Sequence, residues 1–468
     1  MINGTHFGRR EVMIRLVRAF DEGNFAEALD QIPIQMRPKG QTSTRCCTYL
    51  DRAILKYRVM SLLGVACEDE TDEAKTLASY YNELFVENNG EDCKKEHNPL
   101  SVCSTACSGC PPSRIVVTGS CRGCFARPCF YNCPTHAISI VDQVSTIDYS
   151  KCIKCGKCIS ACPFHAIIKT TVPCEEACPV GAIHKDDKGT TTIDFDKCIF
   201  CGKCFNACPF SAILERSQLV QVLHAIKRGE KVVAMVAPAV ADQFPGTIEQ
   251  LFAAILKTGF SDVMEVALGA ELTTQHETAE FEERIAADPK TLMTTSCCPA
   301  YVELVRKHLP GFLPNVSTTP SPMIYSRDLV REQYPDAKVA FIGPCVAKRV
   351  EAERNGVDFV LSFEELGAII AGRRIDIMSC EPKKVERPAI ASARNFAHSC
   401  GVTKAVLEEA AAKAGHDVKI SSDFINGLDK RSIARLKMYA MGKMPANFLE
   451  VMACEGGCVS GPSSLKKL

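Results

Sequence analysis

A short motif, C-P-x-x-A-I, occurs four times in the sequence and restricts the possible folds more than any other feature. The four copies begin at Cys133, Cys162, Cys178 and Cys208. Such repetition indicates one supersecondary unit that is used several times. The surrounding region holds most of the chain's 28 cysteines, too many for disulfides in a reducing cytosol or for small buried hydrophobes. Because thiolates bind soft metals and iron-sulfur clusters, the repeats predict a cluster-binding domain.

Two of the repeats belong to longer runs with the pattern C-x2-C-x2-C-x3-C-P. The runs consist of Cys152, Cys155, Cys158 and Cys162, and of Cys198, Cys201, Cys204 and Cys208. They resemble the two-cluster bacterial ferredoxins, in which the fourth cysteine of each run ligates the other cluster. This resemblance implies two 4Fe-4S clusters, one on Cys152, Cys155, Cys158 and Cys208, the other on Cys198, Cys201, Cys204 and Cys162. Structural zinc is disfavoured, because zinc sites use two separated C-x2-C pairs.

The other two repeats stand in less regular cysteine patterns. One is a looser run of Cys121, Cys124, Cys129 and Cys133, and the other is only the pair Cys174 and Cys178. If ligands are exchanged here too, Cys121, Cys124 and Cys129 take Cys178 and form a third cluster. Cys133 and Cys174 then need two more ligands, for which Cys103, Cys107 and Cys110 are candidates. The alternative is a closed site on the looser run itself, so a fourth cluster stays open.

The sequence on either side of the repeats is poorer in cysteine. The first 95 residues show helical periodicity, for example at Met13, Leu16, Val17 and Phe20. Beyond residue 218, apolar strand candidates alternate with amphipathic helix candidates. The strands are expected at 231–240, 261–268, 291–296 and 338–344, and the helices at 247–259, 278–287, 300–309 and 323–334. We therefore expect an N-terminal α-helical segment at 1–95, a ferredoxin-like α+β iron-sulfur domain at 96–217 and an α/β domain at 218–468.

Charge and hydropathy limit the partners and the location. The chain has 55 basic and 55 acidic residues and a formal net charge of zero, which argues against nucleic acid and anionic membranes as partners. No apolar run reaches the roughly 20 residues that a membrane helix needs, and the polar N-terminus has no signal-peptide core. We expect a cytoplasmic protein with small or weakly charged partners, no nucleic acid and no membrane.

Three cysteine peptides stand out beyond the repeats: "TSCCPA" with Cys297 and Cys298, "IGPCVAK" with Cys345, and "EVMACEGGCVSG" with Cys454 and Cys458. In this order they resemble the signature segments of the iron-iron (FeFe) hydrogenases, whose H-cluster joins a 4Fe-4S cube to a two-iron unit with CO, cyanide and a bridging dithiolate. The resemblance covers about residues 218–468 and makes this the catalytic domain. It implies that Cys298, Cys345, Cys454 and Cys458 hold the cube, with Cys458 bridging to the two-iron unit. The remaining two, Cys380 and Cys400, lack a motif and are expected in the core.

The resemblance also implies a proton route. In this family the first cysteine of the pair, here Cys297, is not a ligand but carries a proton to the bridging amine of the two-iron unit. The rest of the family's relay is matched by Glu277, Glu280, Arg284 and Ser317. On a helix, positions 277, 280 and 284 share one face, so a series of titratable groups is geometrically reasonable. The alternative is an ordinary solvated face with a Glu280–Arg284 pair worth roughly 0.2–0.5 kcal/mol.

Further positions match residues that surround the H-cluster in the family. Lys348 matches the lysine that hydrogen-bonds a cyanide ligand, and Met452 matches a methionine near the two-iron unit. The other implied cofactor-binding residues are Ala237, Pro238 and Ala239 in one loop, and Ser321 and Met323 in another. Some positions depart from the family pattern: Gly343 replaces a methionine, Met323 a glutamine and Ala239 a serine, and "GPSSLKKL" replaces a glycine-rich tail. Such changes tune a metal site and leave turnover rate and direction open.

The resemblance implies an enzyme that interconverts protons and electrons with dihydrogen. Electrons would move through the 4Fe-4S clusters to a ferredoxin or flavodoxin carrier, and hydrogenase maturation proteins would install the H-cluster. A second interpretation is a hydrogen-sensing or redox signalling protein with a slow H-cluster, although no output domain is visible. A third, a polyferredoxin with an inactive catalytic domain, would require broken ligand motifs, and none is broken.

Overall fold

The computed structural model describes residues 4–43, 45–88, 98–385, 387–413 and 420–466. The expected mixed α/β architecture is confirmed. The expected boundary between residues 95 and 96 lies outside the described residues, and the one after residue 217 falls between β8 (Ile213–Glu215) and α9 (Leu219–Lys227). Within the described ranges, no helix combines the length and the apolar character needed to cross a membrane.

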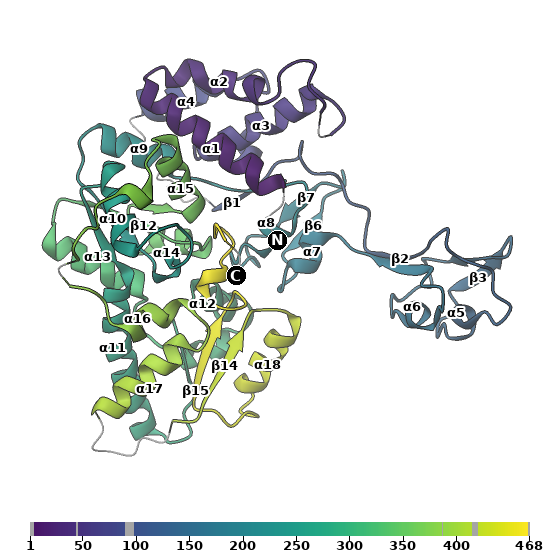
Figure 1. Ribbon diagram of the computed structural model, residues 1–468. Coiled ribbons are helices and arrows are strands. Elements are labelled where there is room, and N and C mark those ends of the chain that lie inside the picture. Colours follow the sequence, from purple (N-terminus) through teal and green to yellow (C-terminus); the bar gives the residue numbers. More distant parts are fainter. Residues whose placement is uncertain (1–3, 44, 89–97, 386, 414–419, 467–468) are drawn as a thin grey trace.

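Helices form the N-terminal part of the molecule: α1 (Gly4–Glu22), α2 (Phe25–Met36), α3 (Thr48–Leu62) and α4 (Leu77–Tyr81). Their apolar faces meet in one core, where Leu16 and Leu29 are fully buried. α1 lies along α15 (Phe363–Gly372) of the C-terminal α/β domain (Figure 1). Ion pairs join the two helices, with Arg10 Nε 3.0 Å from Glu364 and Arg373 2.8 Å from Asp21. The helical part is therefore fixed to the C-terminal half of the chain.

The cysteine-rich region consists of two modules of one design, each with an antiparallel strand pair, a hairpin and two short helices. The inner module contains β1 (Leu100–Val102) paired with β8, the hairpin β6 (Ile183–Lys185)–β7 (Thr191–Ile193), and helices α7 (Pro173–Ala177) and α8 (Lys203–Ala207). The outer module contains β2 (Arg114–Val117) paired with β5 (Ile167–Thr170), the hairpin β3 (Ile138–Val141)–β4 (Val144–Ile147), and helices α5 (Pro128–Tyr131) and α6 (Lys157–Ala161).

The outer module is inserted into the inner one. All of its strands and helices lie in sequence between β1 and α7, and its ends are adjacent because Arg114 pairs with Thr170. Figure 1 shows the outer module as a separate lobe, while the inner module lies against the body of the molecule. The repeats in the sequence predicted related units, but not that one interrupts the other.

Two parallel sheets form the framework of the C-terminal α/β domain. The first has the order β10 (Asp262–Glu265), β9 (Val232–Val236), β12 (Lys338–Ile342), β13 (Phe359–Leu361), and the second the order β11 (Met293–Thr294), β15 (Phe448–Met452), β14 (Ser422–Asn426). β9 and β15 are buried at every position, as expected for parallel strands covered on both faces.

Helices pack around these two sheets (Figure 1). Besides α9 and α15 they are α10 (Ile248–Lys257), α11 (Val266–Ala287), α12 (Pro299–His308), α13 (Pro322–Gln333), α14 (Ala347–Arg354), α16 (Ala391–Arg394), α17 (Gly401–Lys413) and α18 (Lys430–Ala440). The strand expected at 261–268 is wrong after Glu265, where α11 begins. Helical spacing lets Val266, Ala267 and Ala270 all reach the core from this first turn, as their burial shows.

Candidate metal centres and proton route

The predicted ligand peptides all follow parallel strands. Cys297 and Cys298 lie between β11 and α12, Cys345 lies between β12 and α14, and Cys454 and Cys458 follow β15. The strands within each of the two sheets run parallel, so the carboxyl ends of the strands lie at one edge of each sheet. This edge is the usual place for a ligand in open α/β sheets.

A cavity of about 80 Å³ lies at the carboxyl ends of these strands, and residues that follow strands of both sheets line it. A cavity needs only about 10–15 Å³ to admit one water molecule, so the space suits a much larger group. All five cysteines line it. So do six of the implied cofactor-binding residues, namely Ala237, Pro238, Ala239, Met323, Lys348 and Met452. The structure therefore brings together residues from most of the length of the C-terminal α/β domain.

The cysteines around the cavity are crowded enough to repel one another as thiolates. Burial, and then the charges of Cys298 and Cys345, raise the pKa of Cys458 to about 12. Burial and the charges of Cys345, Cys458 and Cys298 also raise the pKa of Cys454 well above its ordinary value. Iron bound to these thiols would deprotonate them and remove the repulsion. Four thiols from three loops around a roomy cavity therefore fit a 4Fe-4S cube. No group of three or more His, Cys, Asp or Glu side chains in the described ranges is arranged to hold a single metal ion.

Lys348 brings a positive charge to the same cavity. Its Nζ donates to Ser321 Oγ at 2.9 Å and pairs with Glu351. Burial alone would lower the pKa of Lys348, but Glu351 and the thiols of Cys345 and Cys297 raise it overall. The ammonium group is therefore kept charged beside the cysteines, where it can bind an anionic ligand. Ser321 takes part in the site by orienting this group.

The departures from the family pattern alter the cavity wall. Met323 is fully buried there. A Cβ atom added to Gly343 would lie 2.6 Å from the ring of Phe341 and 3.3 Å from the Cβ of Ala237. Phe341 thus occupies the space that a larger residue at position 343 would need, and it lines the cavity. Sequence analysis missed Phe341, although an aromatic residue two positions before a glycine faces the same side of a strand.

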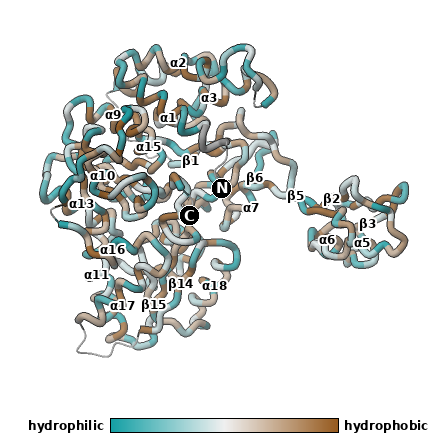
Figure 2. The backbone as a smooth tube through the Cα atoms, viewed as in Figure 1, coloured by the Kyte–Doolittle hydropathy of each residue, from teal (hydrophilic) through white to brown (hydrophobic). Residues whose placement is uncertain are grey.

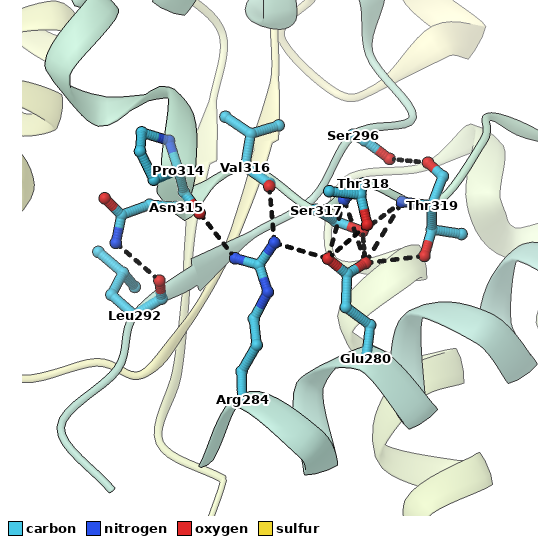
Figure 3. Close-up of polar contacts among 10 residues, drawn as sticks. All are labelled: Glu280, Arg284, Leu292, Ser296, Pro314, Asn315, Val316, Ser317, Thr318 and Thr319. Atoms are coloured by element: carbon cyan, nitrogen blue, oxygen red, sulfur yellow. Dashed lines mark hydrogen bonds and ion pairs between the residues drawn. The ribbon is translucent and has the colours of Figure 1, made fainter. Parts of the chain in front are cut away.

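Glu280 on α11 is surrounded by hydrogen-bond donors (Figure 3). Ser317 Oγ donates to it at 2.6 Å, and Thr318 and Thr319 each donate through the backbone N–H and the hydroxyl. Arg284 forms an ion pair with it at 2.6 Å. Burial alone would raise the pKa of Glu280, but the hydrogen bonds lower it to about 2. The structure brings Glu280, Arg284 and Ser317 together and holds Glu280 as an ion.

Glu277, one turn earlier on the same helix, is in the opposite state. It is fully buried, and within the described residues neither of its carboxylate oxygens has a hydrogen-bond partner. Burial raises the pKa of Glu277 to about 8, partly offset by the nearby backbone N–H of Ser296 and hydroxyl of Ser317. Burial, and then the charge of Glu277, raise the pKa of Cys297 well above its ordinary value. A carboxyl group that is neutral at pH 7 therefore lies close to both Ser317 and the Cys297 thiol.

Glu450 is a buried carboxylate that sequence analysis did not single out. It accepts hydrogen bonds from the N–H groups of Cys400 and Thr403, each at 2.8 Å, and burial raises its pKa. An acidic residue inside an apolar buried strand was the available signal.

Cys380 is buried as expected, whereas the expectation for Cys400 is wrong. Cys400 is only half-buried and has a φ of 68°, because its backbone turns into α17.

In the outer module, two sets of cysteines line two separate small cavities. One set is Cys121, Cys124, Cys129 and Cys162, and the other is Cys133, Cys152, Cys155 and Cys158. Burial, together with the charges of Cys152, Cys155 and Cys133, raises the pKa of Cys158. The fourth cysteine of each run therefore crosses to the other run of the same module.

This arrangement corrects the expected exchange of ligands. Cys162 does not join the run that begins at Cys198, and Cys208 does not join the run that begins at Cys152. In the inner module, burial and the charges of Cys201, Cys198 and Cys178 raise the pKa of Cys204, so Cys178 lies with that run instead of with Cys121. The cysteines that lie together come from runs of one module, and the nested topology decides which runs share a module.

Cys201 connects the inner module with the large cavity. It lines the cavity together with the five cysteines of the C-terminal domain, and its charge contributes to the raised pKa of Cys454, which is caused mainly by burial. The run of Cys198, Cys201 and Cys204 therefore lies next to the cysteines that line the large cavity.

Comparison with known proteins identifies the same two kinds of domain. Residues 230–462 match the iron-only hydrogenase large subunit, C-terminal domain, and residues 145–168 and 191–214 match the 4Fe-4S binding domain. The chain is 27% identical over 392 residues to iron hydrogenase 1 of Clostridium pasteurianum, covering 70% of this chain and 66% of that protein. It is 28% identical over 302 residues to the periplasmic Fe hydrogenase large subunit of Nitratidesulfovibrio vulgaris, covering 53% of this chain and 72% of that protein.

A third relative carries a different name. The chain is 25% identical over 273 residues to the cytosolic iron-sulfur assembly component 3 of Bos taurus, covering 47% of this chain and 57% of that protein. Similarity at this level leaves both hydrogen turnover and cluster assembly open as activities. The domain matches and the hydrogenase relatives agree with the family expected from the three cysteine peptides, and the chain belongs to the iron-only (FeFe) hydrogenase family as a divergent member.

Proposed function

We propose that this protein is an FeFe hydrogenase that interconverts protons and electrons with dihydrogen. The observation that carries the proposal is the cavity at the sheet edge. It gathers four thiols suited to a cube, a fifth thiol at Cys297 and a charged ammonium group at Lys348. A cluster used only for electron transfer needs no cationic side chain of this kind and no buried acid leading to it.

In this proposal Cys298, Cys345, Cys454 and Cys458 hold the cube of the H-cluster. The two-iron unit supplies the iron at which hydrogen is bound and cleaved. Ala237, Pro238, Met323 and Met452 form the apolar wall that excludes water from that unit, while Lys348 holds an anionic ligand by a charge-assisted hydrogen bond. Ser321 keeps Lys348 in place through the bond at 2.9 Å.

The protein's own residues would move the proton. Glu277 holds a proton at pH 7 because its pKa is about 8, close to the value that suits an acid–base group near neutral pH. Glu277 is close both to the Cys297 thiol, which lines the cavity, and to Ser317, which donates to Glu280. Glu280 and Arg284 are partly exposed, with 15% and 21% of their side chains accessible, and would form the entrance. Since Glu280 is a stable ion, its main task in this proposal is to orient Ser317.

Electrons would enter through the two modules. Cys201 lies at the large cavity, so a cluster on Cys178, Cys198, Cys201 and Cys204 would be next to the cube. Clusters in the outer module would extend the path to a ferredoxin or flavodoxin carrier. Maturation proteins would install the two-iron unit. A cytoplasmic location stays a prediction.

Infrared spectroscopy of the matured protein tests the proposal directly, because CO and cyanide bands report the two-iron unit. The bands should be present, and dye-linked hydrogen turnover should be measurable. Glu277→Gln should keep the bands and lower turnover by about 100- to 10,000-fold, the usual contribution of an acid–base group. Glu283→Gln, which changes an exposed residue of the same helix, is the matched control and should retain activity. Absence of the bands would refute the proposal.

The pH dependence gives a second test. Glu277 carries its proton below a pKa of about 8 and loses it above. Hydrogen evolution, which needs proton delivery, should therefore fall as the pH rises through about 8. This step should be missing from the residual activity of Glu277→Gln. A step of the same size in the variant would show that Glu277 is not on the route.

The alternative is a protein that carries clusters without fast turnover, in sensing or in iron-sulfur assembly. The relative from Bos taurus supports considering it. Wild-type turnover as slow as that of Glu277→Gln, with the infrared bands present and responsive to hydrogen, would favour sensing. A protein that never shows the bands but transfers iron-sulfur clusters to an apo-protein would favour assembly.

A further inference from the structure

All four C-P-x-x-A motifs have one local geometry. In each, the alanine N–H donates to the sulfur of the cysteine four residues earlier, at 3.2 Å or 3.4 Å. The pairs are Ala137–Cys133, Ala166–Cys162, Ala182–Cys178 and Ala212–Cys208. The residue before each alanine has a positive φ; these residues are His136, His165, Gly181 and Ser211. Cys133, Cys162 and Cys178 each lie with three cysteines of another run. Since Cys208 has the same geometry, it should also have such a partner set.

Two further cysteines of the inner module lie near Cys208. Burial, and then the charge of Cys208, raise the pKa of Cys174. The Thr191 hydroxyl lies 3.9 Å from the sulfur of Cys174 and 3.6 Å from that of Cys107. Cys107 and Cys208 also pack against the same small apolar cluster. The Thr191 hydroxyl therefore lies at the thiols of Cys107 and Cys174, and Cys208 lies near both of these cysteines.

The backbone identifies Cys110 as the fourth member. In the first C-x2-C segment of each of the three other runs, the residue before the second cysteine has a positive φ: Gly123 at 59°, Lys154 at 57° and Phe200 at 57°. Gly109, which precedes Cys110, has the same conformation with a φ of 56°. The segment from Cys107 to Cys110 is therefore folded as a ligand loop.

The same comparison excludes Cys103. The N–H of Cys107 donates to the Cys103 carbonyl at 3.0 Å. In the two regular runs, the equivalent acceptors are the carbonyls of Asp148 and Asp194, at 3.1 Å and 2.9 Å from the N–H of the first cysteine. Cys103 thus stands at the turn position before the loop, and it is almost fully buried among apolar residues.

We propose that Cys107, Cys110, Cys174 and Cys208 hold a further 4Fe-4S cluster. The outer module is inserted between the second and third of these ligands, which is why the run is not visible in the sequence. The inner module then carries two clusters with exchanged fourth ligands, as the outer module does, and the chain has four accessory clusters. This assignment extends the electron path of the proposed function, but it holds whether or not the chain turns over hydrogen.

Metal analysis of the full chain, reconstituted anaerobically without the two-iron unit, tests the assignment. Four accessory clusters and the cube require about 20 iron atoms per chain. Cys107→Ser and Cys174→Ser should each remove about four iron atoms and one set of reduced-cluster signals in electron paramagnetic resonance. Cys103→Ser, the matched control, should retain all of them. Wild-type iron near 16 atoms, or loss of a cluster in Cys103→Ser but not in Cys107→Ser, would overturn the proposal.

A milder variant keeps the proposal testable even if the cysteine variants fold poorly. In the assembled site the Thr191 hydroxyl would donate to the cluster thiolates, and hydrogen bonds to cluster sulfurs raise the reduction potential. Thr191→Val should therefore make the potential of one cluster more negative while iron content and the other clusters stay unchanged. An unchanged redox titration of all clusters would contradict the placement of Thr191 at a cluster.

Discussion

The inner and outer iron-sulfur modules share one fold but lie in different surroundings. The inner module packs against the C-terminal α/β domain: Asn206 donates to the Pro462 carbonyl at 2.9 Å, and Lys307 donates to the carbonyls of Phe195 and Cys198 at 2.8 Å and 2.7 Å. The outer module stands apart as a lobe (Figure 1). The same repeat can therefore form a buried contact with the rest of the molecule or an exposed surface, depending on what covers it.

The exposed surface of the outer module is apolar and basic. Apolar segments occur in this lobe as well as in the body (Figure 2). Its exposed large side chains are Phe125, Tyr131, Ile140, Val141, Val144, Tyr149, Ile153, Phe164 and Ile168. Lys and Arg clearly outnumber Asp and Glu between residues 111 and 172, although the whole chain is neutral. Such a surface suits contact with an acidic protein, as an electron carrier would be.

The largest effect is expected from removing the outer module. Because Arg114 and Thr170 are paired, a two-residue Asn-Gly turn can replace residues 115–169 without moving the ends. The shortened protein should lose about eight iron atoms. Hydrogen production driven by the protein carrier should fall to background, while production driven by a small dye should stay within about twofold. Equal loss of both activities would show that the two modules do not have separate tasks.

A matched pair of ligand variants should give the next largest effect. Cys201→Ser changes the inner cluster beside the large cavity, whereas Cys155→Ser changes the exposed cluster of the outer lobe. We expect Cys201→Ser to lower dye-driven turnover at least about tenfold, as perturbed metal sites commonly do. Cys155→Ser should affect only carrier-driven turnover. The comparison between the modules fails if steady-state assays give the opposite order.

The surface of the outer module should set the affinity for the carrier. Ile153 is 64% exposed, and Ile153→Asp places a charge in the apolar surface. The KM for an acidic carrier should rise about tenfold, equivalent to about 1.4 kcal/mol, with kcat unchanged. Met438→Asp, at an exposed apolar position of α18, is the control. Lys154→Glu should weaken the salt dependence of the carrier KM, because screening acts on exposed charges. If the KM for the carrier changes equally in Met438→Asp, the surface of the outer module is not the docking site of the carrier.

The smallest effect separates two equivalent glycines. Gly156 and Gly202 are the N-cap residues immediately before α6 and α8, with φ values of 80° and 72°, so alanine at either position costs about 1–2 kcal/mol of backbone strain. A Cβ at Gly202 would also lie 2.7 Å from Pro462 Cγ, whereas a Cβ at Gly156 would meet nothing within 4 Å. Gly202→Ala should therefore reduce the free energy of unfolding by about 1–3 kcal/mol more than Gly156→Ala does. Its thermal midpoint should be the lower of the two. Equal midpoints would mean that the inner module is not tightly packed.

The sequence predicted which cysteines meet at the large cavity better than it predicted the partners of the accessory cysteines. Cys298, Cys345 and Cys454 each follow a buried or mostly buried parallel strand, and parallel strands place their carboxyl ends together, so motif order was enough. The partners of Cys162 and Cys178 could not be predicted in the same way, because they depend on which strands pair across the insertion. Glu450 and Phe341 were missed because their local signals, an acid inside an apolar strand and an aromatic residue two positions before a glycine, are weak, and their burial depends on the packing of the whole domain. The opposite states of Glu277 and Glu280, one turn apart, depend on the donors of a distant loop.

The insertion of one module into the other also affects how the chain is made. During synthesis β1 emerges first, but its partner β8 follows only after the whole outer module has left the ribosome. The outer module, whose contacts are all closer in sequence, can fold and receive its clusters while the inner module is still open. Cys107 and Cys110 must therefore stay reduced and unoccupied by the wrong partners until Cys174 and Cys208 arrive. In cells that are short of iron or exposed to oxygen, oxidation or wrong pairing of these early thiols is expected to limit the yield of complete protein.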